Sequence, residues 1–137
     1  MQTQEQRIAE HAKRIAAEMK SIPTPAGATA PLRPRQAQII IERVARYWNV
    51  RIDALTGRSR LAHVVRPRQV ACYLMHIVRG ASLSEIGRWM NRDHTTVIHA
   101  VRIVKQQIEQ DQEFAQQVEY VMESLTDPPE GPALIDV

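Results

Sequence analysis

Four apolar residues in the stretch Arg92–Val104 (RDHTTVIHAVRIV) recur at the spacing of an α-helix: Val97, Ile98, Val101 and Val104. They fall on one side of a helix and would pack inward. The polar residues of the same stretch, namely His94, Thr95, Thr96, His99 and Arg102, then project from the other side. Asp93 stands where an N-cap residue is expected. The stretch therefore predicts an amphipathic helix with a polar outer face.

A second helix is predicted a dozen residues upstream, at Ser82–Trp89 (SLSEIGRW). Ser82 and Glu85 have the capping-box spacing, which satisfies two backbone amides at a helix start. Two such helices joined by a short turn form a helix-turn-helix. Hydroxyls, imidazoles and a guanidinium on the outer face of the second helix can reach base edges and phosphates in a DNA major groove. The pair predicts a DNA-binding protein.

The rest of the chain also has helical patterns. A helix beginning near Pro34 would bury Ile40, Val44, Tyr47 and Trp48, and a helical turn is expected around Asp53–Leu55. Pro67 suits the first turn of a helix that runs to about Arg79, with Val70, Leu74, Ile77 and Val78 inside and Gly80 as its stop. The apolar pattern of the later helix continues to Ile108, and Phe114, Val118, Val121 and Leu125 predict a last, acidic helix. No segment alternates as a strand would, so the predicted fold class is all-α.

With 137 residues, the chain can bury one modest core. Residues 1–20 predict a short amphipathic helix with too little apolar area to stand alone, which leaves docking on the domain, pairing with a partner, or fraying open. Residues 21–35 are rich in proline and indicate a linker. A compact helix-turn-helix domain is expected at 36–109, an acidic helix at 110–126 and a disordered tail at 127–137.

The formal net charge of +3 conceals a strong asymmetry. Residues 33–105 hold 14 Lys and Arg against 4 Asp and Glu, whereas the remaining segments hold 4 against 11. A basic middle between acidic ends favours an anionic partner for the middle. Most of these basic residues are arginines, which suit phosphates and base edges better than lysines do.

Several other classes of protein are disfavoured. No run of about eighteen apolar residues suggests a membrane span, and no leader segment is recognised, so a cytoplasmic, nucleoid-associated protein is expected. Cys72 lies in an apolar run and is expected to be a buried thiol. His94 and His99 are five residues apart, which turns them away from each other on a helix, so no metal site is expected. No catalytic set or cofactor cradle stands out, so the chain is expected to be no enzyme and to need no cofactor.

Four landmarks in order resemble a known family. They are Val44–Val50 (VARYWNV), Val65–Leu74 (VRPRQVACYL), Ser82–Gly87 (SLSEIG) and Arg92–Ala100 (RDHTTVIHA). Over roughly residues 39–108, this order is similar to that of the C-terminal DNA-binding domain of the bacterial chromosomal replication initiator DnaA. Any one landmark could arise by chance, but four in register over one domain are a specific signal.

The resemblance implies a role for each matching residue. In the family, the Asp-His-Thr-Thr…His helix enters the major groove of a short asymmetric DNA box, which assigns base contacts or their positioning to Asp93, His94, Thr95, Thr96 and His99. A family arginine in the loop after the second helix reaches the adjacent minor groove, and Arg60 holds that position. Contacts to the DNA backbone are implied for Arg58, Arg66, Arg68, Gln69, Leu83, Ser84, Arg92 and Arg102. We expect the phosphate contacts of Arg68 and Gln69 to be helped by the free amides of a helix N-terminus close to them.

This chain departs from the family at several points. Met90 and Asn91 precede Arg92 where relatives commonly have two glycines, and Leu83-Ser84 replaces the usual Leu-Pro. Leu61, Ala62 and His63 make the basic loop less polar than in many relatives. The sequence also lacks the Gly-x-x-x-x-Gly-Lys-Ser/Thr loop of an ATPase module, so neither ATP hydrolysis nor a nucleotide-driven filament is expected.

The favoured interpretation is a sequence-specific protein that binds double-stranded DNA and acts in replication initiation or its regulation. A small transcription regulator of phage, plasmid or bacterial type is an alternative with the same interface. A second class of function is a protein-interaction module that binds a partner or itself through its N-terminal or C-terminal helix, with weak, unspecific DNA affinity. Trp48 and Trp89 are expected to belong to the core rather than to stack on bases.

Overall fold

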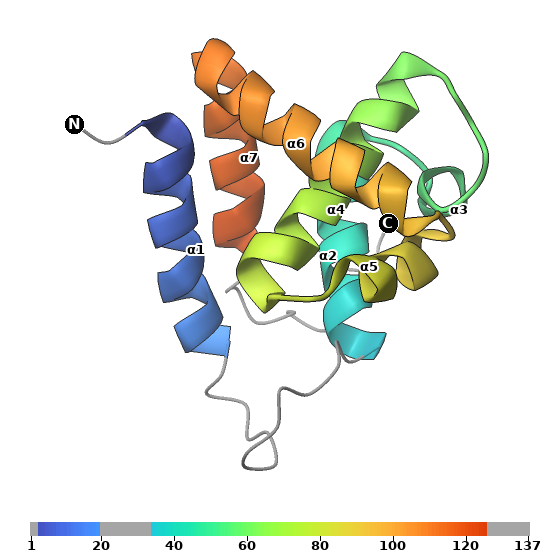
Figure 1. The fold of residues 1–137 in the computed structure, drawn as a ribbon, viewed down its shortest axis with the longest axis horizontal. Helices are drawn as coiled ribbons and strands as arrows, with labels where there is room; N and C mark the ends of the chain where they lie inside the picture. The colour runs from blue at the N-terminus through green and yellow to red at the C-terminus, as the bar shows by residue number, and fades with distance from the viewer. Residues whose placement is uncertain (1–2, 20–33, 126–137) are drawn as a thin grey trace.

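A computed structural model describes residues 3–19 and 34–125, and these residues form helices and connecting turns without a strand (Figure 1). The helices are α1 (Gln4–Met19), α2 (Pro34–Trp48), α3 (Ile52–Leu55), α4 (Ala62–Arg79), α5 (Leu83–Met90), α6 (His94–Gln110) and α7 (Gln112–Ser124). The predicted all-α fold class is confirmed. The predicted linker and tail lie almost entirely outside the described residues, as does the side chain of Met19.

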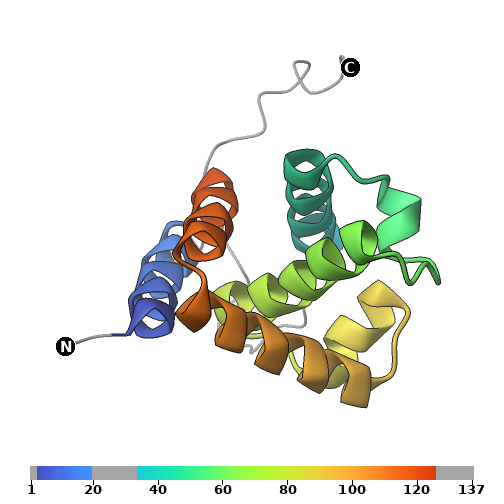
Figure 2. The same ribbon diagram turned by 90° about the horizontal axis from the view of Figure 1, so that it is seen from above.

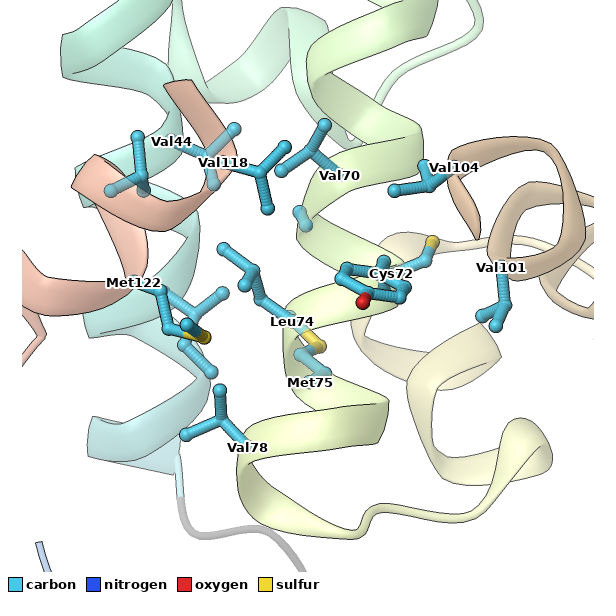
Figure 3. Close-up of a cluster of buried hydrophobic side chains, with 14 of the residues drawn as sticks. Val44, Val70, Cys72, Leu74, Met75, Val78, Val101, Val104, Val118 and Met122 are labelled. Carbon is cyan, nitrogen blue, oxygen red and sulfur yellow. The ribbon is translucent and has the colours of Figure 1, made fainter. Parts of the chain in front are cut away.

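Helix α4 is the centre of the core. Its residues from Val70 to Met75 are all buried, so that no face of this stretch is left for solvent. Figure 2 shows α4 running between α2 and α6, with α1 and α7 beside its C-terminal half. In Figure 3, Val70 and Leu74 point toward Val44 and Val118, whereas Cys72 points toward Val101 and Val104. A helix that is apolar all round is the expected centre of a helical domain.

The first helix docks on the rest of the chain. Ile8, Ala12 and Ile15 of α1 are buried against α4, α6 and α7. Polar contacts fix its start, because the Tyr73 hydroxyl donates to Glu5 (3.1 Å) and the Glu5 amide donates to Glu109 (2.8 Å). Burial, and then the charge of Glu5, raise the pKa of Tyr73. Of the three possibilities left open by the sequence, the structure shows docking within the chain.

The set of α2 residues that are buried differs from the prediction at one residue. Ile40 and Val44 are buried as expected, together with Ile41, but Tyr47 is 40% exposed. Its ring packs on Trp48 (centroids 4.7 Å apart) and on Tyr120 of α7 (5.5 Å). The prediction for Tyr47 was wrong because this residue lies in the last turn of α2, where Trp48 and Tyr120 cover its ring only in part.

The start of α4 also differs from the prediction. We expected Pro67 in the first turn, but the helix begins at Ala62 and Pro67 lies inside it. Pro67 cannot donate to the carbonyl four residues earlier, which removes a single helical hydrogen bond. Val64 and Pro67 are both buried in this part of the helix. The helix ends at Arg79 as predicted, because Gly80 adopts φ 65° and donates its N–H to the His76 carbonyl (3.0 Å).

The thiol of Cys72 is 2% exposed, and burial raises its pKa to about 12. The prediction of a buried thiol is confirmed. At pH 8 the folded protein should therefore react with a thiol reagent many times more slowly than an unfolded chain, since the thiolate is the nucleophile. Titration with a chromogenic disulfide should detect this thiol only after denaturant is added. Rapid reaction without denaturant would contradict the burial.

Among the described residues, none of the helices combines the length and the apolar character needed to cross a bilayer.

Candidate nucleic-acid interface

Helices α5 and α6 form the predicted helix-turn-helix. The Ser82 hydroxyl accepts the N–H of Glu85 (3.1 Å), which confirms the serine half of the capping box. After α5, Asn91 turns the chain with φ 57°, and the Arg92 N–H donates to the Gly87 carbonyl (2.8 Å). Ile86 and Met90 of α5 are buried together with Val97 of α6. Hydrogen bonds and packing thus fix the angle between the two helices.

Asp93 is the N-cap of α6, as predicted. Its carboxylate accepts the backbone N–H of Thr95 (3.1 Å) and the hydroxyl of the same residue. Hydrogen bonds from Thr95, ahead of the nearby His94, lower the pKa of the Asp93 carboxyl. The cap fixes the start of the helix and the orientation of Thr95.

This cap should make the stability of the domain depend on pH at the acidic end. Because the pKa of Asp93 is lower in the folded protein than in the unfolded one, its contribution is complete above the unfolded pKa, about 4, and is lost as the pH falls through the folded value. The carboxyl carbon of Asp93, followed by NMR, should titrate at lower pH in the folded protein than in a peptide spanning Asn91–Thr96. Titration at or above the peptide value would show that the cap does not form.

The outer face of α6 collects the predicted base-contact residues. Val97, Ala100, Val101 and Val104 are buried against α4 and α5, and Ile98 is half-buried. His94, Thr95, Thr96, His99 and Arg102 are all exposed. The helix therefore presents hydroxyls, imidazoles and a guanidinium on its solvent side, as the sequence predicted.

The loop between α3 and α4 lies beside the turn of the helix-turn-helix. It carries Arg58 and Arg60, both exposed. A guanidinium nitrogen of Arg92, from the turn, donates to the Gly57 carbonyl of this loop. Another nitrogen of Arg92 donates to the Asn91 carbonyl (2.9 Å). The two basic segments are thus joined by direct contact, although 35 residues separate Gly57 from Arg92.

The structure places Arg68 differently from the prediction. Its side chain is 7% exposed, and its guanidinium donates to backbone carbonyls rather than facing solvent. The expected help from a helix N-terminus is also wrong, because α4 begins at Ala62 and Arg68 and Gln69 lie in its body. Gln69 is half-buried. Arg66 is exposed and lies over the ring of Phe114 (5.3 Å to its centroid).

A polar hollow lies between α5, the turn that follows it and the start of α6. Ser84 and Arg88 line it from α5, and Arg92, Asp93 and His94 from the turn and from α6. Arg88, which is exposed, was not among the residues predicted from the sequence. Its position on the solvent side of the first helix of a helix-turn-helix could have identified it. Leu83 is half-buried and faces a second, smaller groove with Ile98 and Arg102.

Within the described ranges, His, Cys, Asp and Glu side chains form no group of three or more that could hold a metal ion. Trp48 and Trp89 are partly buried and pack against the core, in agreement with their expected role.

Comparison with known proteins agrees with this geometry. Residues 37–104 match the family model described as the helix-turn-helix of the bacterial DnaA protein. The chromosomal replication initiator protein DnaA of Gluconobacter oxydans is 41% identical over 99 residues, covering 69% of this chain and 21% of the relative. The protein of the same name from Nitrobacter hamburgensis is 44% identical over 98 residues, with the same two coverages of 69% and 21%. That of Caldanaerobacter subterraneus subsp. tengcongensis is 38% identical over 82 residues, covering 60% of this chain and 18% of the relative. The chain thus spans about a fifth of the length of these relatives.

Proposed function

Over residues 37–104 the chain belongs to the family of bacterial DnaA helix-turn-helix domains, and we propose that it binds double-stranded DNA sequence-specifically at sites resembling DnaA boxes. The observation that carries the proposal is the outer face of α6, where Thr95, Thr96 and His99 are exposed on a helix whose other side is buried. A B-DNA major groove, about 12 Å wide, admits such a helix.

We assign sequence recognition to α6 and to the α3–α4 loop. Asp93, His94, Thr95, Thr96 and His99 would contact base edges in the major groove or position the side chains that do. Arg60, exposed on the adjacent loop, would enter the neighbouring minor groove. Since the loop touches the turn through Arg92, both contacts can be made on one side of a duplex.

Phosphate contacts would hold the domain in register on the DNA. Their candidates surround α6 and are exposed or half-buried: Arg58, Arg66, Gln69, Leu83 through its backbone, Ser84, Arg92 and Arg102. The polar hollow that Arg88 helps to line gives a further place for a phosphate. Such contacts set position and affinity, whereas base contacts set specificity. Arg68 is left out of this set because its guanidinium is buried.

We further propose that this binding serves replication initiation or its regulation, by occupancy of initiator boxes in the nucleoid. The relatives are named chromosomal replication initiators, which supports that process over the transcription-regulator alternative. The proposed role is binding rather than catalysis.

The interaction-module alternative assigned partner binding to the N-terminal and C-terminal helices, and one route to such binding is through their apolar faces. In the structure Ile8, Ala12 and Ile15 of α1 and Phe114 and Val118 of α7 are buried within the chain. This packing does not favour a second function that depends on those faces.

Fluorescence anisotropy with a DnaA-box duplex and a scrambled duplex of the same composition, at two salt concentrations, tests the proposal. We expect the box to bind at least about a thousandfold more tightly, the low end for sequence-specific proteins. Both affinities should fall as salt rises, because phosphate contacts release counterions. Equal affinity for the two duplexes at both salt concentrations would refute the proposal.

A further inference from the structure

Arg68 is a buried arginine that binds a loop rather than solvent. From α4, its Nε donates to the Leu55 carbonyl (2.7 Å), Nη2 to the Ala54 carbonyl (3.0 Å) and Nη1 to the Ser59 carbonyl (2.9 Å). All three acceptors belong to the end of α3 or to the loop that follows it. Burying a charged guanidinium is costly unless it is hydrogen-bonded, and each of its three nitrogens donates to one of these carbonyls.

Two of the acceptors lie where a helix ends. Ala54 and Leu55 are the last residues of α3, a helix of four residues. The final carbonyls of a helix have no partner further along the same helix. The Ala54 carbonyl also accepts the N–H of Gly57 (3.2 Å), so Arg68 adds a second hydrogen bond there. The planar guanidinium holds several donors in a fixed geometry, which a lysine ammonium does not. Arg68 therefore ties the end of α3 and Ser59 to one rigid point on α4.

Arg92 holds the same loop from its other side, through the Gly57 carbonyl. The two guanidinium groups lie close enough that the charge of Arg92, after burial, contributes to lowering the pKa of Arg68. Gly57 itself permits the tight path of the loop, because an added Cβ would lie 2.8 Å from the Asp53 carbonyl oxygen. Arg58 stands between Gly57 and Ser59, and Arg60 follows Ser59, so both exposed arginines adjoin tethered carbonyls.

We infer that Arg68 is a positioning residue: together with the hydrogen bond from Arg92 to Gly57, it fixes the α3–α4 loop against the helix-turn-helix so that Arg60 reaches the minor groove at a set distance from α6. The inference rests on the proposed function. Ordering a loop before binding removes an entropic cost that would otherwise weaken the complex. It also gives Arg68 a role different from the phosphate contact predicted from the sequence.

A double-mutant cycle on the box duplex tests this role. R60A and R68Q should each weaken binding about tenfold. The double variant should be within about threefold of R60A alone, since a misplaced loop then costs no more than the phosphate contact of Arg58. R68K should resemble R68Q, because lysine cannot reproduce the three carbonyl contacts. R14Q, which removes an exposed arginine from α1, controls for net charge.

A direct phosphate contact by Arg68 would give a different result in each of these measurements. If Arg68 contacts a phosphate, the losses from R60A and R68Q should multiply to about a hundredfold, and R68K should restore binding. R68Q should then also reduce the slope of log affinity against log salt by about 0.9 in the R60A background. Thermal melting identifies any variant that fails to fold. If R68Q fails to fold, R68K takes its place in the cycle with R60A. Absence of box preference in the unmodified protein would refute the proposed function itself, whereas multiplicative losses with box preference intact would refute only the positioning role.

Discussion

Replacing Thr95, Thr96 and His99 together by alanine should leave a folded protein that still binds DNA but no longer prefers the box. All three side chains are exposed on α6, so their removal leaves no cavity. Alanine also favours a helix more than threonine or histidine does. A good base contact contributes about 1–3 kcal/mol of discrimination. Loss of three should reduce a preference of about a thousandfold to less than about tenfold.

Anisotropy against box and scrambled duplexes measures this effect. A matched control replaces Gln110, Gln112 and Gln116, three exposed residues at the far end of α6 and on α7, by alanine. The control should keep the full preference. Affinity for the scrambled duplex should hardly change in either variant, because phosphate contacts provide most of it. A box preference that survives the replacement of all three would place sequence recognition elsewhere on the molecule.

Replacing Gly87 by alanine should damage both the stability and the DNA binding of the domain. A Cβ at this position would lie 2.4 Å from the carbonyl oxygen of Arg92, a backbone atom that cannot move without opening the turn. The same turn depends on the hydrogen bond from the Arg92 N–H to the Gly87 carbonyl. Overpacking of this kind costs about 1–3 kcal/mol or more, against a gain of up to about 1 kcal/mol in helix propensity.

We expect a net loss of about 2 kcal/mol, measured by urea unfolding, together with a clear drop in affinity for the box. G80A is the informative comparison, because no atom lies within 4 Å of its added Cβ and only the positive φ of 65° opposes it. That strain should cost about 1 kcal/mol and leave box preference unchanged. If G87A were as stable and as active as the unmodified protein, the close approach of α5 to the turn would be refuted.

The sequence determined features that depend on neighbours along the chain. Periodic apolar residues located α6 and α7, since a buried face repeats with the turn of the helix, and the capping-box spacing of Ser82 and Glu85 located α5. Ser82, Asp93 and Gly80 marked helix ends correctly, because a cap is a contact between residues two to five positions apart. The outward face of α6, which carries the proposed function, followed from the same periodicity.

Tertiary structure alone decided the features that depend on distant residues. Tyr47 has the spacing of a core residue, yet in the last turn of α2 the rings of Trp48 and Tyr120 cover it only in part. Pro67 resembles a helix start, yet the helix begins at Ala62 and Pro67 is buried inside it. Arg68 has the appearance of a phosphate contact, yet its hydrogen bonds go to carbonyls 9, 13 and 14 residues away. Local pattern specifies which residues can face outward, but only packing between distant segments specifies which of them do.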